Sequence, residues 1–228
     1  MALTPDQLAS KLALLRLRDP GLLLFGAATH RYRLNECLSC EELQKFEVSV
    51  GVTLPDEYRN FLLRFGNGGA GPGYGLLSLK ESIREFGNDP LQNISRPFIP
   101  PRSARAKVEG RAYPEDGLLP LAHIGCGHMW MLVVNGAERG AIWSYQSGGD
   151  YDPACLELPD YPSGATLEQR LKANDRLADA LLSNPSRRLG FWDWYIDWLD
   201  RTSTQVPRSS PRWRTLVRRL SLHLGRRK

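Results

Sequence analysis

The sequence predicts an α+β domain in which helices from both ends of the chain pack against an antiparallel β-sheet. Apolar residues at helical spacing, with capping signals, occupy the first 65 residues and recur between residues 166 and 201. Short runs of β-forming residues joined by turn signals fill residues 118–145. Strands with such short connections pair antiparallel, because parallel strands need a crossover of about a dozen residues or more.

Two N-terminal helices are expected at about residues 4–17 and 40–50, because each segment opens with a capping box. In this motif a Ser or Thr side chain and a Gln or Glu three residues later satisfy the first free amides of the helix. The residues in these positions are Thr4 with Gln7 and Ser39 with Glu42.

A third helix is expected at about residues 55–65, where apolar side chains recur at i, i+3, i+4 and i+7. Pro55 suits the first helical position, where its missing N–H is not needed. Gly66 is expected to take the left-handed conformation that ends a helix. The apolar face consists of Tyr58, Phe61, Leu62 and Phe65.

Residues 66–71 read GNGGAG and match the G-x-G-x-x-G string of dinucleotide-binding loops. Such a loop follows a strand and opens a helix, whose N-terminus holds the pyrophosphate. Here a helix precedes the glycines, and the Lys-Ser or Lys-Thr pair of a P-loop is missing. We therefore interpret the glycines as the end of a helix and the entry to the sheet, and we expect no cofactor.

Strands are expected at about residues 118–124, 129–134 and 140–145, with Asn135-Gly136 marking a hairpin between the last two. A first strand is expected at 75–79 and a short final one near 155–158. Residues 89–117 are rich in proline and basic side chains. This stretch is predicted to be a solvated mobile loop, with contact to an acidic partner as the alternative.

Two helices are expected to close the domain. The first runs from a capping box at Thr166 and Gln169 to about Leu182, before Pro185. The second, at about residues 191–201, has one aromatic face that is predicted to lie on the sheet. A separate acidic stripe is predicted to be a solvated or partner-facing surface, with a catalytic or metal-binding set as the alternative. The aromatic face is Phe191, Trp194, Tyr195, Trp198 and Leu199, and the stripe is Asp193, Asp197 and Asp200.

The cysteines are predicted to be ordinary reduced thiols. Cys37 and Cys40 have C-x-x-C spacing, but a redox site of that type needs a βαβ setting, and none is evident. Cys126 lies between His123 and His128, at a spacing unlike that of a zinc finger. Redox activity and metal binding remain the alternatives. The fourth cysteine is Cys155.

Catalytic motifs are missing from the sequence: it has no G-x-S-x-G, no H-E-x-x-H and no kinase signature. We therefore expect neither catalytic residues nor a metal site. Asp150-Tyr151-Asp152 follows two glycines and is predicted to be an exposed loop. Its functional interpretation is contact with a protein, because tyrosine is enriched at interfaces; its structural interpretation is a plain turn.

The net charge of +5 belongs to the C-terminal segment. Residues 208–228 contain eight basic residues and no acidic one, and the rest of the chain has 22 basic and 25 acidic residues, a net charge of −3. The domain itself thus offers no electrostatic reason to bind nucleic acid. The segment has a basic amphipathic pattern suited to an anionic membrane, nucleic acid or a partner groove, with a poorly ordered tail as the alternative. Its apolar face would be Trp213, Leu216, Val217, Leu220 and Leu224.

We expect three regions: an N-terminal helix with its connection in residues 1–24, the α+β domain in 25–201 and the basic tail in 202–228. The chain does not open with a secretory signal. Its longest apolar run, residues 21–28, is far shorter than the ~20 residues that span a bilayer. A cytoplasmic protein is the expectation.

Several motifs occur in the order typical of the SUKH superfamily, also called the Smi/Knr family. The sequence resembles that family over about residues 25–201. Each motif is weak alone, and their order carries the resemblance. The motifs are Leu54-Pro55-x-x-Tyr58-x-x-Phe61-Leu62, Asn67-Gly68-Gly69, Gly73-Tyr74-Gly75-Leu76, Gly125-Cys126-Gly127, Leu132-Val133-Val134, Arg139-Gly140-x-x-Trp143 and Phe191-x-x-Trp194-Tyr195-x-x-Trp198-Leu199.

The resemblance implies a twisted antiparallel sheet packed by helices and a role in binding proteins rather than in catalysis. Bacterial members of the family are associated with immunity to toxins, often nucleases, and fungal members regulate cell-wall synthesis. The leading hypothesis is a cytoplasmic immunity protein that binds a cognate toxin. The alternatives are a regulatory interaction module without a toxin partner, and association with a membrane or nucleic acid through residues 208–228. Candidate contact residues are Tyr74, Asp150, Tyr151 and Asp152.

Overall fold

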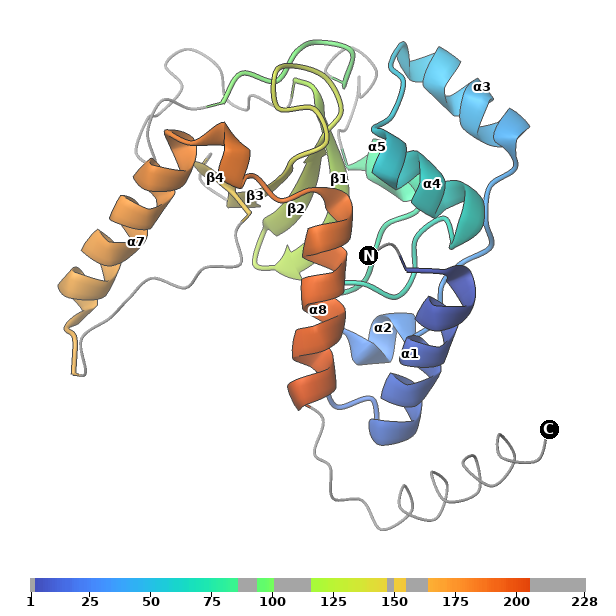
Figure 1. The fold of residues 1–228 in the computed structure, drawn as a ribbon, viewed down its shortest axis with the longest axis horizontal. Helices are drawn as coiled ribbons and strands as arrows, with labels where there is room; N and C mark the ends of the chain where they lie inside the picture. Colours follow the sequence, from blue (N-terminus) through green and yellow to red (C-terminus); the bar gives the residue numbers. More distant parts are fainter. Residues whose placement is uncertain (1–2, 86–93, 101–115, 147–149, 155–163, 206–228) are drawn as a thin grey trace.

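The computed structural model describes residues 3–85, 94–100, 116–146, 150–154 and 164–205. Helices come first along the chain, then a sheet, then helices again (Figure 1). This arrangement confirms the expected α+β class. Residues 206–228, on which the expected tail contacts depend, lie outside the described ranges.

Among the described residues, one antiparallel sheet has four strands in the order β1-β2-β3-β4. The hairpin predicted around Asn135 and Gly136 joins β2 to β3, and Gly136 also forms a bridge with Phe98. Each strand therefore pairs with the one next to it in sequence. The strands are β1 (Leu118–Gly125), β2 (His128–Val133), β3 (Ile142–Gln146) and β4 (Asp150–Pro153).

Capping boxes open three of the helices as the sequence predicts. Thr4 Oγ1 accepts a hydrogen bond from the Gln7 N–H at 3.2 Å, and Gln7 Oε1 accepts one from the Thr4 N–H at 2.9 Å. Ser39 with Glu42 and Thr166 with Gln169 form the same reciprocal pairs. These boxes begin α1 (Pro5–Arg18), α3 (Cys40–Val50) and α7 (Leu167–Leu182).

Helix α4 (Asp56–Arg64) differs from the prediction at both ends. Pro55 is the N-cap rather than the first helical residue. Gly66 does not take the left-handed conformation; its N–H bonds to the Phe61 carbonyl at 3.1 Å. Glycine is needed there for space, because a Cβ on Gly66 would lie 2.6 Å from the Asn35 carbonyl oxygen.

The prediction of a strand at residues 75–79 is wrong. Leu76 makes only single bridges, to Gly69 and Ala122, and the chain then enters helix α5 (Leu79–Arg84). Ser78 and Glu81 form a capping box there, so a local helix signal outweighed the β-forming character of the preceding residues. The short helix α2 (Ala27–His30) was also not predicted.

The prediction of an exposed loop at Asp150-Tyr151-Asp152 is wrong as well, because these residues form strand β4. Their backbone pairs with residues 144–146 of β3, and this pairing replaces the expected turn. The strand predicted near 155–158 lies outside the described residues. Within the loop predicted at 89–117, Ile94 and Phe98 are buried, whereas residues 95–97 and 99 are exposed.

The sheet separates two layers of apolar side chains. Leu118 pairs with Val133 and Leu119 pairs with Leu132, so successive pairs point to opposite faces. One face carries Leu119, Leu121, Leu132 and Ile142 into the main core with α1, α3, α4 and α8 (Phe191–Gln205). The other face packs Leu118, Met131, Val133, Ala141 and Trp143 against Phe98, with Leu182 of α7 beside them.

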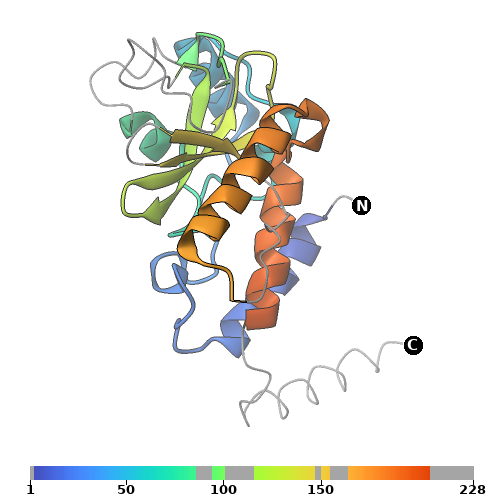
Figure 2. The same cartoon turned by 90° about the vertical axis from the view of Figure 1, so that its left-hand side faces the viewer.

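Helix α8 joins the sheet to the N-terminal helices. Phe191, Trp194, Tyr195 and Leu199 are buried in the main core, as the aromatic face predicts. The Tyr195 hydroxyl donates to the Ala70 carbonyl oxygen at 2.8 Å. Figures 1 and 2 show that the later turns of α8 continue beyond the sheet beside α1. No described helix combines the length and apolar character that crossing a bilayer would require.

A buried ion pair holds the start of α8 to the hairpin between β2 and β3. Arg188 follows the 3₁₀ turn η1 (Pro185–Arg187), and its side chain is 6% exposed. Its Nε and Nη2 atoms donate to the two carboxylate oxygens of Glu138 at 2.6 and 2.8 Å. The guanidinium also lies 5.1 Å from the ring centre of Trp143, whose indole N–H donates to Glu138. The pair is thus fully partnered within the core.

Replacing Arg188 by Met should lower the free energy of unfolding by about 3–5 kcal/mol, because the Glu138 carboxylate would remain buried without its cation. Urea denaturation at pH 7 measures the change. Lys172→Met is the matched control: Lys172 pairs with Glu168 on an exposed face, and its loss should change stability by less than about 1 kcal/mol. Adding Glu138→Gln to Arg188→Met should recover part of the loss, and equal losses from Arg188→Met and Lys172→Met would contradict the assignment.

Candidate functional site

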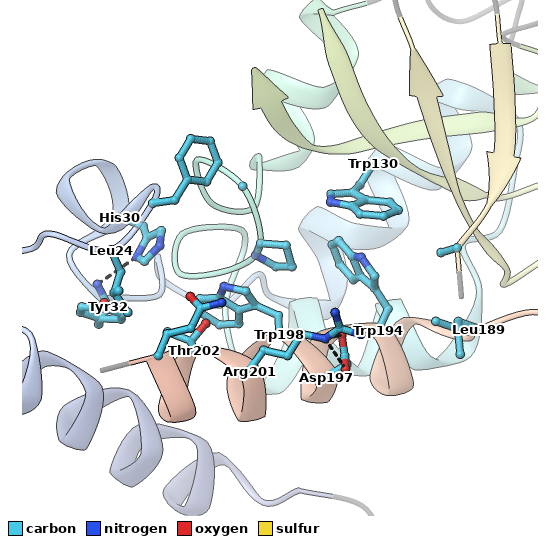
Figure 3. A pocket seen from close by; sticks show the side chains of 15 residues that line it. Leu24, His30, Tyr32, Trp130, Leu189, Trp194, Asp197, Trp198, Arg201 and Thr202 are labelled. Atoms are coloured by element: carbon cyan, nitrogen blue, oxygen red, sulfur yellow. Dashed lines mark hydrogen bonds and ion pairs between the residues drawn. The ribbon is translucent and has the colours of Figure 1, made fainter. Parts of the chain in front are cut away.

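A cleft with six aromatic side chains among its fifteen lining residues lies between α8 and the loops that precede α2 and follow α4. We call it the aromatic cleft; its volume is about 340 Å³. Figure 3 shows His30 and Tyr32 at one end, with Trp130 and Trp194 toward the other. Its lining residues are Leu24, Phe25, His30, Tyr32, Pro72, Gly73, Trp130, Ala154, Leu189, Trp194, Asp197, Trp198, Arg201, Thr202 and Gln205.

Helix α8 supplies one wall through a single row of residues. Trp194, Asp197 and Trp198 are spaced i, i+3 and i+4, so they lie on one face of the helix. Asp197 pairs with Arg201, one turn later, at 2.7 Å. The predicted separate stripe of Asp193, Asp197 and Asp200 is therefore divided: Asp197 lines the cleft, and Asp200 pairs with Lys11 of α1 at 3.3 Å.

The opposite wall is organised by the buried carboxylate of Asp19. Its oxygens accept hydrogen bonds from the Leu23 and Leu24 N–H groups, at 2.8 and 3.2 Å, and from the Tyr32 hydroxyl at 2.8 Å. Burial and the adjacent carboxylate raise the pKa of Tyr32 above its ordinary range, so the phenol stays protonated. Leu22, Arg31 and Tyr32 have positive φ angles, a strained conformation for such side chains. The Asp19 bonds hold this strained loop in place.

His30 lies at the base of the cleft and is neutral near pH 7. Its Nδ1 accepts a hydrogen bond from the Tyr32 N–H at 3.0 Å, so the neutral ring carries its proton on Nε2. Burial lowers the pKa of His30 from 6.5 to about 4. Its ring meets the ring of Trp198 edge-on, with 5.8 Å between their centres. His30 therefore acts as a packing element that spans the two walls.

Two exposed rings form a projecting edge of the cleft, which we call the aromatic lip. Phe25 and Tyr74 are 61% and 44% exposed, and their ring centres are 4.9 Å apart. Gly26 and Gly73 bring the supporting loops together: a Cβ on Gly26 would lie 1.8 Å from the Gly73 carbonyl oxygen. The Tyr74 N–H bonds to the carbonyl of His123 in β1 at 2.9 Å, so the lip is fixed to the sheet.

The sequence-predicted contact residues are divided between the lip and strand β4. Tyr74 forms the lip with Phe25, a residue that the sequence did not single out. In the sheet, Asp152 pairs with Ser144, which pairs with Trp130, so these three residues share one face. Asp152 is half-buried beside that row. The side chains of Asp150 and Tyr151 lie outside what the structure describes.

The glycine loop after α4 uses its own polar groups. The Gly69 N–H bonds to the Leu76 carbonyl at 2.8 Å, and the Leu76 N–H returns a bond to Gly69 at 2.7 Å. The Ala70 N–H bonds to the Arg33 carbonyl at 2.7 Å. Because these amides are paired within the protein, the loop does not present them to a phosphate.

In the described part of the chain, no group of three or more His, Cys, Asp and Glu side chains could hold a metal ion. Cys37, Cys40 and Cys126 are exposed, and Cys155 lies outside the described residues. His123 Nε2 lies 3.1 Å from a carboxylate oxygen of Glu85.

Acidification should weaken the fold through His30. The unfolded chain takes up a proton near pH 6.5 and the folded chain only near pH 4, so this contribution is present above pH 6.5 and is lost as the pH falls toward 4. His30→Asn keeps an acceptor near Nδ1 and removes the titration. We expect the stability difference between the two proteins to shrink by about 2 kcal/mol from pH 7 to pH 4, measured by urea denaturation. A constant difference would contradict the lowered pKa.

A model of the SMI1 / KNR4 family (SUKH-1) matches residues 37–161. The match contains α3, α4, α5 and the whole sheet, and it is narrower than the resemblance seen over residues 25–201. A search among curated proteins found no match. Because the match spans more than half of the 228 residues, the chain belongs to the SMI1 / KNR4 family (SUKH-1).

Proposed function

We propose that the protein is an immunity protein that binds a cognate toxin and neutralises it without catalysis. The exposed aromatic lip carries this proposal. Phe25 and Tyr74 stand at the edge of a cleft with tryptophan walls, and Leu23 beside them is 88% exposed. Aromatic residues are enriched at protein interfaces, and anchors of this kind supply much of the binding energy.

The rigid support of the lip favours binding. Ordering flexible side chains and loops on association lowers affinity, so a surface that is already ordered loses less free energy. The Asp19 hydrogen bonds and the close backbone contact at Gly26 hold the lip in the free protein. This order supports a protein partner with a matching hollow or apolar ridge.

Strand β4 extends the proposed surface. It is the last strand in the order of the described sheet, and its Asp150, Tyr151 and Asp152 remain proposed contact residues. The net charge of −3 outside residues 208–228 is small, but its sign suits a basic partner such as a nuclease. Opposite charge mainly accelerates association. We therefore propose that nuclease toxins are the first class to test.

Phe25→Ala and Tyr74→Ala should each weaken the complex with the cognate toxin by about tenfold or more, as expected for aromatic anchors. Calorimetric titration of the purified proteins measures the dissociation constant. Val48→Ala is the control, because Val48 is 75% exposed on α3, away from the cleft. Its effect should be less than about twofold. If all three variants bind as tightly as the unaltered protein, the lip is not the interface.

Co-expression tests the function itself. The unaltered protein should restore growth to cells that express a toxin encoded beside it, and the Phe25→Ala/Tyr74→Ala double variant should restore less at equal protein level. Loss of rescue with retained folding would assign the effect to the lip. Failure of the unaltered protein to rescue or to bind any neighbouring toxin would contradict the proposed immunity role.

A further inference from the structure

The charged side chains of the aromatic cleft form one ion pair. Among the residues that line it, only Asp197 and Arg201 carry charge near neutral pH, because His30 is neutral. Arg201 Nε lies 2.7 Å from Asp197 Oδ2 and 2.8 Å from Oδ1. Figure 3 shows this pair beside Trp194 and Trp198. The cleft thus offers an entering side chain one carboxylate, one guanidinium and several tryptophan rings.

The pair is accessible enough to exchange partners. The Asp197 side chain is 29% exposed and that of Arg201 is 48% exposed. Ion pairs between neighbouring turns of an exposed helix add only a few tenths of a kcal/mol. An incoming group of suitable charge can therefore replace one partner with little loss of stability.

The tryptophans decide which charge is favoured. The faces of aromatic rings carry negative electrostatic potential, so they attract cations and disfavour carboxylates. Trp130 and Trp194 meet at 5.9 Å with their planes 68° apart, and this arrangement gives the cleft two ring orientations. A cation gains from the rings and from Asp197, whereas an anion gains only from Arg201.

We propose that the aromatic cleft accepts an arginine side chain from the protein partner. The guanidinium would lie against Trp130 and Trp198, the two half-buried tryptophans of the lining, and replace Arg201 at the Asp197 carboxylate. Arginine suits the site better than lysine, because its planar group stacks on aromatic rings and can bond both carboxylate oxygens. A neutral apolar side chain would instead remove water from the ion pair without offering either partner a hydrogen bond.

This inference rests on the proposed function only in taking the partner to be a protein. Whether the cleft prefers a cation to an anion or an apolar group can be tested without that partner. The probe is the peptide acetyl-Gly-Arg-Gly-amide, titrated into the full-length protein. Binding is followed by NMR through the indole N–H signals of the tryptophans. Matched peptides with glutamate or norleucine in place of arginine report an anion site or a purely apolar site.

The two partners of the ion pair should respond in opposite directions. Asp197→Asn should weaken binding of the arginine peptide by about tenfold, because the charge-assisted hydrogen bonds are lost. Arg201→Gln should strengthen binding of the arginine peptide by about threefold, because the Arg201 guanidinium no longer competes with the peptide for the Asp197 carboxylate. Asp193→Asn is the control on the same helix, since Asp193 does not line the cleft. It should have no effect.

Three results would overturn the inference. Tighter binding by Asp197→Asn together with preference for the glutamate peptide would identify an anion site. Weaker binding by both variants would show that the ion pair only shapes the wall. Equal binding of the arginine and norleucine peptides would identify an apolar pocket. The two proposals can fail separately. If the protein binds the arginine peptide but does not rescue cells from a toxin, the arginine site stands and the immunity role is rejected. If it rescues cells but does not bind the arginine peptide, the immunity role stands and the arginine site is rejected.

Discussion

The packing of α8 on the sheet is the constraint on which the rest of the structure depends. Phe191, Tyr195 and Leu199 are buried in the main core, and the Tyr195 hydroxyl bonds to Ala70 in the loop after α4. This bond satisfies a buried hydroxyl and also fixes the helix against the loop. The adjacent row of α8 then faces the space beside that loop. The aromatic cleft thus lies between this row of α8 and the loop that the Tyr195 bond holds.

Polar groups hold the second wall of the cleft, where apolar packing is limited. The loop before α2 exposes Leu23 and Phe25 and contains positive φ angles, so it gains little from burial. The Asp19 carboxylate offsets this by accepting two backbone N–H groups and the Tyr32 hydroxyl. A strained loop that is held in this way is typical of functional surfaces. The strained residue Leu22 and the exposed ring of Phe25 occur in the same segment, and this coincidence supports a binding role.

The two faces of the sheet pack against different parts of the protein. One face is closed by Phe98 and Leu182, and the Arg188–Glu138 pair anchors the entry to α8 beside it. The other face packs the helices of the main core and places Trp130 of the internal strand β2 next to Trp194. Belonging to the SMI1 / KNR4 family (SUKH-1) accounts for the sheet, α3, α4 and α5. Most of the cleft's lining comes from α8 and from the loops around α2, which lie outside the matched residues.

The sequence predicted the features that depend on residues close together in the chain. These are the capping boxes at Thr4, Ser39 and Thr166 and the strands β1, β2 and β3. The sequence also identified Tyr74 as a contact candidate, but it did not identify Phe25 or Asp19. Their roles depend on contacts with distant segments, such as Phe25 with Tyr74. Only the tertiary structure decided that Asp197 lines the cleft and Asp200 pairs with α1, since helical spacing defines a face but not its neighbour.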